Sequence, residues 1–315
     1  MKPLVSVIVP LYNKAEYIQR SLDSIAGQAF GDFEAIVVND GSTDGGERLV
    51  AGYPDRRFRL IGQPNAGPGS ARNRGVAEAR AEWIAFLDAD DEWMPEFLSA
   101  SLRFASQYAG EAAAVTSAYL ECPQAISTEP LWRRRGISEG LFRLTPDTPP
   151  MRAVYDLAFM SPCSTIVRAG AIRRHGGFFE ERCLYAEDAF LWLKVLLNEP
   201  VAFQIKPLVR FHREASGLSN NFVHRSPVEP FLVYPDRIEA DCPPALRGLL
   251  AGILAIRAFK RACVLGYWGQ WREAIALRKR FSPPGAWRLP YYGAALMAGT
   301  PLAGPLGKAL RKLRR

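Results

Sequence analysis

Residues 83–91 read Trp83-Ile84-Ala85-Phe86-Leu87-Asp88-Ala89-Asp90-Asp91, an apolar run that ends in three carboxylates. A short apolar run bounded by polar residues is typical of a buried strand. Side chains two positions apart on a strand share a face, so Asp88 and Asp90 are expected to point toward one place. Two hard oxygen donors suit Mg²⁺ or Mn²⁺, and such an ion suits a diphosphate. An isolated Asp-rich stretch is also typical of a plain polar turn, so the interpretation depends on the rest of the chain.

Strand and helix patterns alternate over the first 120 residues. Strands are predicted at 5–9, 33–38, 58–61, 83–87 and 112–120, with helices after Asn13, at 71–81 and from Pro95 to about Tyr108. Asn13 and Glu16 have the spacing of a capping box at the start of the first helix. This order predicts an α/β fold with a mostly parallel, Rossmann-like central sheet and flanking helices. Ligands of such sheets sit at the carboxyl ends of the strands, where the three aspartates stand.

The alternation weakens after residue 120 and stops at about residue 216. Residues 121–160 contain five prolines and predict a loop-rich insertion that shapes an acceptor cleft. A strand is predicted at 164–167, a helical turn at 169–174 and a helix at 188–197, and basic helices are predicted at 246–266 and 271–280. At 315 residues and 48% hydrophobic, the chain is long enough for one large domain with an appended region.

The net charge of +8 is distributed unevenly along the chain. Residues 245–315 contain 14 Lys and Arg and a single acid, Glu273, whereas the other 244 residues hold 26 basic and 31 acidic side chains. No zinc, helix-turn-helix or RNP-like pattern accompanies the basic tail, so nucleic acid is not an expected partner. An anionic membrane surface is the partner that this charge distribution predicts.

The end of the chain has the pattern of an interfacial helix. Thr300 and Pro301 predict an N-cap and a first helical position. A leucine stripe then faces a basic one, formed by Leu302, Leu306, Leu310 and Leu313 opposite Lys308, Arg311, Lys312 and Arg315. Packing of this helix against its own domain or against a dimer mate is the alternative. The uncharged stretch 289–307 contains three prolines and four glycines, which argues against a membrane span.

The start of the chain and its cysteines predict the compartment. Leu4 to Val9 is short and runs into Pro10, which indicates a strand and not a signal peptide. The five cysteines are scattered without any C-x-x-C spacing, which predicts reduced structural thiols. We therefore expect a cytoplasmic protein, peripheral on the cytoplasmic face of the membrane.

Six motifs in sequence order resemble those of glycosyltransferase family 2. They are Val5-Ser6-Val7-Ile8-Val9-Pro10-Leu11-Tyr12-Asn13, Val38-Asn39-Asp40-Gly41-Ser42-Thr43-Asp44, Asn65-Ala66-Gly67-Pro68-Gly69-Ser70-Ala71-Arg72-Asn73-Arg74-Gly75, Phe86-Leu87-Asp88-Ala89-Asp90-Asp91, Gly176-Gly177-Phe178 and Ala186-Glu187-Asp188. Each motif alone is weak, but six in order are specific. The resemblance covers about residues 4–213 and implies a GT-A fold and an inverting, nucleotide-sugar-dependent transferase.

The resemblance also implies a domain division. Residues 1–215 would be a GT-A catalytic domain, with a nucleotide-binding half at about 1–120 and an acceptor half at about 121–215. Residues 216–315 would be a basic helical C-terminal region, about which the family resemblance says little. The oligomeric state is left open by the sequence.

Four residues are predicted to contact the nucleotide. Asp40 is similar to the family aspartate that holds the uracil ring, and capping of the following helix is its alternative. Pro10 and Tyr12 offer a rigid turn and an aromatic face beside the base, although such a tyrosine is also common in cores. Arg72 begins a helix after a Gly/Pro loop and is expected to reach the base or the phosphates; a solvated helix arginine is the alternative.

By the same resemblance, Asp88 contacts the ribose or assists the metal, and Asp90 binds a divalent Mn²⁺ or Mg²⁺ directly. The metal would neutralise the diphosphate of the leaving group. Asp91 has an alternative role as a cap for the helix that begins near Pro95. His212 lies where some relatives have a polar residue near the diphosphate, so it is a candidate metal or phosphate ligand; a structural histidine is its alternative.

Asp188 is the candidate general base, with Glu187 as an orienting neighbour. The acceptor hydroxyl must lose a proton as it attacks the anomeric carbon, and a carboxylate opposite the metal accepts it. The alternative is that both acids stand in a first helical turn only because the helix dipole favours them there. The sequence departs from the family after Gly176-Gly177-Phe178, where Phe179 precedes Glu180 in place of an Asp-Glu pair.

Together these features predict a metal-dependent inverting glycosyltransferase that uses a nucleotide diphosphate donor, UDP-linked by preference. The acceptor would be a hydroxyl of a saccharide or lipid-linked molecule in cell-surface polysaccharide synthesis. A non-catalytic sugar-nucleotide-binding or scaffold protein of the same fold is the alternative, but Asp90 and Asp188 are both retained. A Rossmann oxidoreductase is disfavoured because no G-x-G-x-x-G follows the first strand.

Overall fold

The computed structural model describes residues 2–181, 183, 185–215 and 228–281. The strands are β1 Val5–Leu11, β2 Phe33–Asn39, β3 Phe58–Gly62, β4 Trp83–Phe86, β5 Glu92–Trp93, β6 Ala114–Cys122, β7 Ile126–Ser127, β8 Gly140–Phe142, β9 Thr165–Arg168 and β10 Val201–His212. The helices are α1 Ala15–Ala26, α2 Gly46–Ala51, α3 Pro68–Glu78, α4 Phe97–Ser106, α5 Glu129–Arg134, α6 Pro150–Phe159, α7 Ala169–Arg174, α8 Glu187–Asn198, α10 Pro230–Val233, α11 Asp236–Glu239, α12 Arg247–Tyr267 and α13 Trp271–Arg280. Single 3₁₀ turns are η1 Pro162–Ser164, η2 Arg213–Ala215 and η3 Pro244–Leu246.

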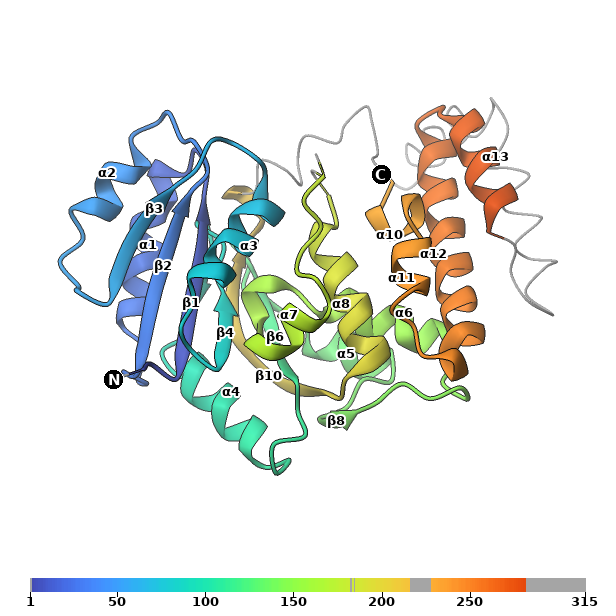
Figure 1. The fold of residues 1–315 in the computed structure, drawn as a ribbon, viewed down its shortest axis with the longest axis horizontal. Helices are drawn as coiled ribbons and strands as arrows, with labels where there is room; N and C mark the ends of the chain where they lie inside the picture. The colour runs from blue at the N-terminus through green and yellow to red at the C-terminus, as the bar shows by residue number, and fades with distance from the viewer. Residues whose placement is uncertain (1, 182, 184, 216–227, 282–315) are drawn as a thin grey trace. The chain divides into compact units, whose positions relative to one another are not determined.

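One mixed sheet forms the centre of the first part of the chain (Figure 1). Its main path runs β3-β2-β1-β4-β9-β6-β10-β5, with β7 paired to β6 and β8 to β10. The pairs β3/β2, β2/β1 and β1/β4 are parallel, as the sequence predicts, whereas β9 runs antiparallel to both β4 and β6. Strand β6 is also parallel to β10, a long strand that is not among those predicted from the sequence. The carboxyl ends of β1, β2 and β4 therefore meet at one edge, just before Tyr12, Asp40 and Asp88.

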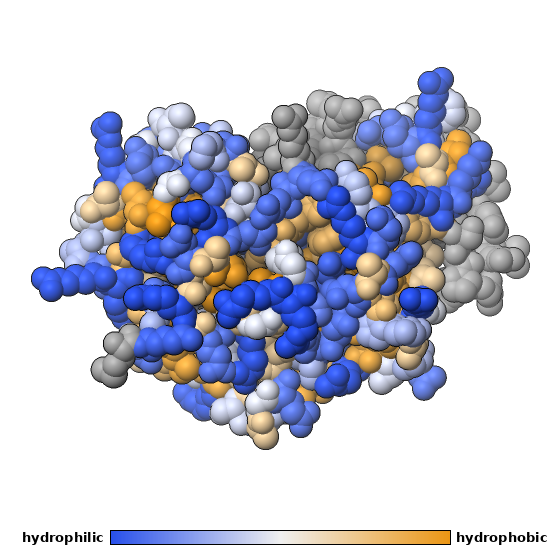
Figure 2. All heavy atoms as spheres, in the orientation of Figure 1, coloured by the Kyte–Doolittle hydropathy of each residue, from blue (hydrophilic) through white to orange (hydrophobic). Residues whose placement is uncertain are grey.

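The central strands are buried on both faces because their sequences are continuous apolar runs. Val7, Val37 and Ala85 of β1, β2 and β4 have no exposed surface. Helix α3 packs on β1 and β2, with Gly75 against Ile8, whereas Ile18 and Leu22 of α1 are fully buried in the core that contains Val7 and Val37. On the face drawn in Figure 2, hydrophilic residues predominate and hydrophobic ones appear in small groups between them.

Contacts divide the chain into two compact units. The first contains residues 1–144 and 155–217, and the second contains residues 145–154 and 218–315. The first unit holds the sheet, and within the second unit α12 and α13 pack against each other. Glu229 is 2% exposed and accepts hydrogen bonds from Arg257 and Arg261 of α12, each at 2.9 Å. Paired and hydrogen-bonded in this way, a buried carboxylate is tolerated in a core.

The structure also differs from the predicted elements at the start of α1 and in the insertion 121–160. Helix α1 begins at Ala15, and Asn13 does not cap it but lies at φ 49° with its side-chain oxygen accepting from the Thr43 amide. The Ala15 amide donates instead to Asp44, so the cap comes from a distant loop. The insertion 121–160, predicted as loop-rich, contains β7, α5, β8 and α6, and it is anchored by the fully buried Trp132.

The second unit contains basic helices close to their predicted positions, α12 at Arg247–Tyr267 and α13 at Trp271–Arg280. The interfacial helix predicted from Thr300 to Arg315 lies outside the described residues. All five cysteines are free thiols. Among the described helices, none combines the length and the apolar character that crossing a membrane requires.

Candidate active site

The three aspartates form a turn at the carboxyl edge of the sheet. Strand β4 ends at Phe86, and the Asp91 amide donates to the Asp88 carbonyl at 3.0 Å. The argument that Asp88 and Asp90 share a direction because they alternate on a strand is therefore wrong, since both residues lie beyond the end of β4. Asp90 is nevertheless close enough to feel the charge of Asp88: burial, and then that charge, raise the pKa of Asp90.

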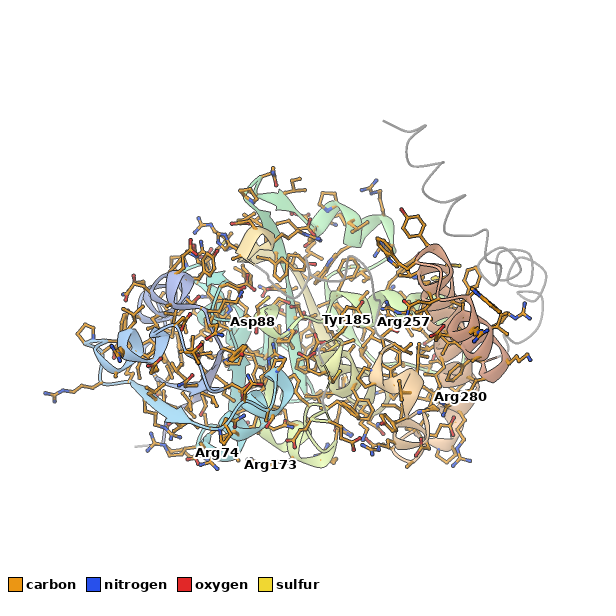
Figure 3. All side chains as sticks on the ribbon, turned by 90° about the horizontal axis from the view of Figure 1, so that it is seen from above. Arg74, Asp88, Arg173, Tyr185, Arg257 and Arg280 are labelled. Atoms are coloured by element: carbon orange, nitrogen blue, oxygen red, sulfur yellow. The ribbon has the colours of Figure 1, made fainter. Side chains whose placement is uncertain are left out.

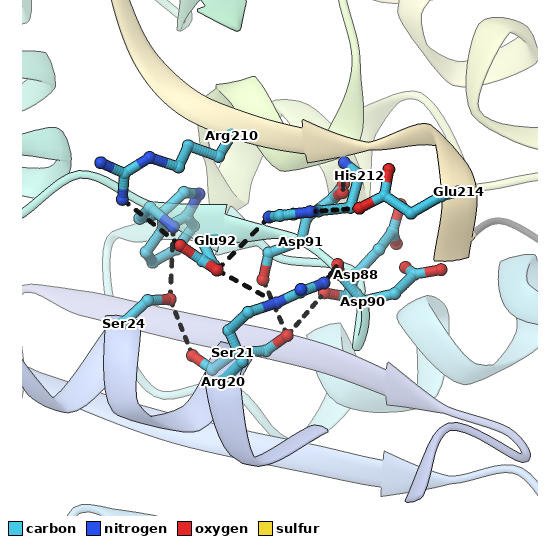
Figure 4. A network of polar contacts seen from close by, with 11 residues as sticks. Arg20, Ser21, Ser24, Asp88, Asp90, Asp91, Glu92, Arg210, His212 and Glu214 are labelled. Atoms are coloured by element: carbon cyan, nitrogen blue, oxygen red, sulfur yellow. Dashed lines mark hydrogen bonds and ion pairs between the residues drawn. The ribbon is translucent and has the colours of Figure 1, made fainter. Parts of the chain in front are cut away.

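Helix α1 and strand β10 hold this carboxylate turn in place (Figure 4). Ser21 donates to the Asp91 carbonyl at 2.7 Å, and Arg20 donates to the Asp90 carbonyl at 2.6 Å. The Asp91 side chain accepts from the His212 amide at 2.8 Å, so Asp91 is not the cap of α4, whose N-cap is Glu96. Backbone geometry of the turn is thus fixed from two sides.

Arg72 joins the carboxylate turn to Glu187, the neighbour of the candidate general base Asp188. From α3, one guanidinium nitrogen contacts Asp88 at 2.7 Å and another contacts Glu187 at 2.6 Å. The side chain is 5% exposed, which contradicts the alternative of a solvated helix arginine. Burial alone would lower the pKa of Arg72, but the charges of Asp88 and Glu187 raise it, so the residue is a permanent cation. In Figure 3, Asp88, the partner of Arg72, lies within the first unit. Arg74, which follows Arg72 by two residues in α3, lies at the periphery of that unit.

Asp188 stands beside this bridge and forms none of the ion pairs found among the described residues, although the charge of Arg72 acts to lower its pKa. It occupies the first turn of α8, after Ala186 in the left-handed region at φ 59°. Burial, and then the charge of Glu187, raise the pKa of Asp188 to about 7. Since Arg72 contacts Glu187 and not Asp188, the two acids have different environments, and a carboxyl with a pKa near neutrality is suited to proton transfer.

Asp40 organises the loop that precedes α3. Its carboxylate accepts from the Ala66 and Gly67 amides, both at 2.9 Å, and from the Gln63 side chain at 2.7 Å. The capping alternative is wrong, since α2 begins at Gly46 behind the N-cap Gly45. Asp40 is 3% exposed, so its contact with a base remains a prediction beside the loop-holding role that the structure shows.

Tyr12 and Pro10 lie at the end of β1. The Tyr12 side chain is 49% exposed, unlike a core tyrosine. An exposed aromatic ring beside a strand end is a suitable surface for stacking a base. Pro10 is partly buried within β1, where its backbone pairs with Val38 of β2.

The structure places His212 among acids of β5 and of η2. Its Nδ1 lies 2.8 Å from Glu214 and its Nε2 lies 3.3 Å from Glu92 (Figure 4). The hydrogen bond with His212 is the largest cause that lowers the pKa of Glu214. Both ring nitrogens therefore already face carboxylates of the chain, which favours the structural role over the predicted metal ligand; the metal role is not tested by this arrangement.

The carboxylates of the turn fit a divalent metal ion that is coordinated partly by the protein and partly by phosphate oxygens. Among the described residues, no group of three or more His, Cys, Asp or Glu side chains is placed to hold an ion. Asp88 and Asp90 are instead two carboxylates at a partly exposed turn, and Mg²⁺ is commonly bound by one or two carboxylates together with substrate phosphates. Asp88 and Asp90 would hold such an ion, and phosphate oxygens of a donor would supply further ligands.

Sequence reasoning missed three residues that shape this site. Lys14 contacts the Asp90 carboxylate at 2.6 Å, and Arg20 and Ser21 hold the carbonyls of the same turn. Lys14 and Arg20 are partly buried and Ser21 is fully buried, but in the sequence Lys, Arg and Ser within a helix suggest ordinary solvent-facing positions. Their role comes from contact in space with the carboxylate turn, which lies 70 positions away along the chain from Arg20 and from Ser21 and 76 from Lys14, so no local pattern reveals it.

This α/β fold, with carboxylates and a buried arginine at the strand ends, is that of a GT-A transferase domain. The family model "Glycosyl transferase family 2" matches residues 6–168. The match covers more than half of the chain, and the chain belongs to glycosyltransferase family 2.

Two curated relatives come from Bacillus subtilis strain 168. The "putative glycosyltransferase EpsH" is 42% identical over 105 residues, which are 33% of this chain and 30% of EpsH. The "putative teichuronic acid biosynthesis glycosyltransferase TuaG" is 39% identical over 106 residues, 33% of this chain and 42% of TuaG. The matched segment therefore spans less than half the length of either relative.

Two solved structures are similar over most of the chain. Staphylococcus aureus TarS 1–349 in complex with UDP-GlcNAc is 25% identical with a TM-score of 0.69, covering 88% of this chain and 80% of TarS. The mannosyltransferase PcManGT from Pyrobaculum calidifontis, in complex with GDP-Man and Mn²⁺, is 19% identical with a TM-score of 0.55, covering 97% of this chain and 87% of PcManGT. The second likeness concerns the fold alone.

Proposed function

We propose that this protein is a metal-dependent inverting glycosyltransferase. It moves a sugar from a nucleotide diphosphate donor, UDP-linked, to a hydroxyl of a saccharide or lipid-linked acceptor. The observation that supports the proposal is the Arg72 bridge: one guanidinium contacts both Asp88, which we assign to the donor, and Glu187, the neighbour of Asp188. Donor chemistry and proton transfer are thereby brought to one site.

The reaction is a single displacement. The acceptor hydroxyl oxygen forms a bond to the anomeric carbon, its proton passes to the Asp188 carboxylate, and the bond between that carbon and the β-phosphate oxygen breaks. A metal held by Asp88 and Asp90 would neutralise the charge that develops on the departing diphosphate. Arg72 contacts the Glu187 carboxylate at 2.6 Å, which leaves Asp188 as the proposed proton acceptor of the pair.

The nucleotide and the setting rest on relatives and on the exposed end of β1. TarS binds UDP-GlcNAc, and PcManGT binds GDP-Man with Mn²⁺. Tyr12 supports base stacking through its 49% exposed side chain, with Asp40 and Pro10 beside it at the strand ends. The printed role of TuaG in teichuronic acid biosynthesis supports cell-surface polysaccharide assembly as the setting.

We further propose that the protein is peripheral on an anionic membrane surface at the cytoplasmic face. The support is charge: residues 245–315 carry 14 basic side chains and one acid. In α13, the exposed Arg272 and Lys279 contribute to this charge. Attraction to anionic lipid amounts to about 1 kcal/mol per basic residue near the surface.

The experiment that tests the proposal is Asp188→Asn. The substitution keeps size and most hydrogen bonding but removes the proton acceptor, so transfer should fall by about 100-fold or more. Binding of UDP with Mn²⁺, measured by calorimetric titration, should survive. Transfer is followed as release of the nucleoside diphosphate in the presence of a competent acceptor.

The matched control is Glu187→Gln, which changes the neighbouring acid in the same helical turn. Because Glu187 orients Arg72 and does not accept the proton, this variant should lose much less activity than Asp188→Asn. The base lies elsewhere if Asp188→Asn turns over at the wild-type rate, or if donor binding and transfer disappear together. A protein that binds the donor but never transfers sugar would be the non-catalytic alternative.

A further inference from the structure

Lys14 contacts the carboxylate that is the proposed metal ligand. From the N-cap position of α1, its ammonium nitrogen lies 2.6 Å from Oδ2 of Asp90 and 2.5 Å from the carbonyl oxygen of Ala215. The side chains are 22% and 13% exposed, so water screens this pair only partly. One ammonium group therefore joins α1, the carboxylate turn and the 3₁₀ turn that follows β10.

The surroundings explain why a cation is needed at this point. Asp88, Asp90, Asp91 and Glu92 follow one another within five positions, and Asp90 and Asp91 are both buried. Clustered carboxylates repel one another and are costly to bury without a counter-charge. Arg72 supplies that charge to Asp88, and Arg20 and Arg210 supply it to Glu92. Lys14 is the cation in contact with the Asp90 side chain among the described ion pairs.

A divalent ion and an ammonium group compete for the same carboxylate. Mg²⁺ binds carboxylate oxygens at about 2.0–2.1 Å, closer than the ammonium of Lys14 now lies to Oδ2. Two cations on one carboxylate repel each other strongly in a partly buried site. A lysine on a flexible four-carbon stem can withdraw, whereas the short Asp90 side chain on its anchored turn cannot.

We propose that Lys14 is a built-in counter-cation that holds Asp90 until a divalent cation displaces it, and that this displacement frees the Ala215 carbonyl. The inference rests on the proposed function, in which Asp90 is a metal ligand. Lys14 is then a positioning residue: it keeps the carboxylate turn closed against η2 in the free protein. Binding of the ion is coupled to release of the turn Arg213–Ala215.

The test compares Mn²⁺ binding, without nucleotide, in wild-type protein and in Lys14→Met. Methionine keeps the unbranched apolar stem and removes the competing charge, so calorimetry should give an affinity for Mn²⁺ about tenfold higher. Hydrogen exchange of the peptide covering residues 209–215 gives a second readout. Mn²⁺ should speed exchange in wild type, and Lys14→Met should already exchange at the faster rate without the metal.

Two variants act as controls. Lys14→Arg keeps a cation and should retain the lower wild-type affinity. Arg20→Met removes another cation of α1, one that contacts the Asp90 carbonyl and not its carboxylate, so it should change Mn²⁺ affinity far less. Equal or weaker Mn²⁺ binding by Lys14→Met, with wild type binding the ion, overturns the counter-cation role alone. Failure of every variant to bind Mn²⁺, with UDP present as well as without it, overturns the metal site itself and this inference with it.

Discussion

Asp90 and Asp88 differ in how the free protein compensates their charge. Asp88 is paired with the permanently charged Arg72, whereas Asp90 is paired with the more exposed Lys14. Replacing Asp90 by Ala should abolish the metal-dependent part of UDP affinity while the protein stays folded. Folding is expected to survive because the substitution also removes a desolvated charge from an acidic cluster.

The measurement is calorimetric titration of UDP into Asp90→Ala with Mn²⁺ and with chelator. Near-ultraviolet circular dichroism and the melting temperature serve as the folding control. Metal-dependent affinity that is unchanged from wild type would remove Asp90 from the ligand set.

The raised pKa of Asp188 predicts a pH dependence with a definite sign. A general base works only when ionised, and a pKa of about 7 means that ionisation of Asp188 is incomplete below neutrality. We expect kcat/KM, which reports the free enzyme, to rise about tenfold per pH unit below pH 7 and to level above it. If kcat/KM instead falls only below about pH 4, the assignment of Asp188 as the general base is contradicted.

The same shift affects stability. The folded pKa lies above the ordinary value of an aspartate, so the folded state binds the proton more tightly and the free energy of unfolding falls as pH rises from about 4 to 7. Asp188→Asn removes this loss. The difference in melting temperature between Asp188→Asn and wild type should therefore shift in favour of the variant as pH rises from about 4 to 7.

At the scale of elements, the close approach of α3 to the turn before α8 positions the base. Gly69, in the first turn of α3, has no side chain, and an added Cβ would overlap the carbonyl oxygen of Phe179 and approach Glu187 at 3.3 Å. Asn73 then ties the same turn, since its side chain accepts from the Phe178 amide at 2.8 Å. The Glu-Asp pair is thus located by helix-to-turn packing.

Gly69→Ala should destabilise the protein by about 1–3 kcal/mol, the usual cost of overpacking. Sugar transfer should fall more than UDP binding, because displacement of the turn moves α8 and Asp188. Chemical denaturation and steady-state kinetics measure the two effects. Gly170→Ala is the matched control: Gly170 also lies in a first helical turn but has open space, so stability should change little. Equal behaviour of the two variants would show that the approach of α3 does not position the base.

At the scale of the whole molecule, the charge asymmetry predicts membrane binding through the end of the chain. Deleting residues 300–315 should release the protein from anionic liposomes in a sedimentation assay. Salt should weaken binding of the intact protein, because attraction extends over a Debye length of about 8 Å at physiological ionic strength. Zwitterionic liposomes are the control. If the full-length protein ignores anionic liposomes at low salt, the interfacial helix and the peripheral location are both wrong.

The sequence by itself determined the family, the succession of the first core strands along the chain and the place of the acids after the strand ends. Continuous apolar runs such as Val5–Val9 predict buried parallel strands, and the meeting of their carboxyl ends follows from β1 lying between β2 and β4. Periodicity also predicted α13 with its bounds. These features depend on neighbouring residues in the chain, so local sequence patterns predict them.

Only the tertiary structure decided how the acids are used. Arg72 and Glu187 are 115 positions apart, and Lys14 and Asp90 are 76 apart. No periodicity links such residues, since their contact depends on how α3, α8 and α1 pack around the sheet. The turn geometry of Asp88–Asp91, the loop-holding role of Asp40 and the acidic neighbours of His212 are likewise set by segments that meet only on folding. Charge compensation in a partly buried site is a property of distances in space, which the order of residues does not specify.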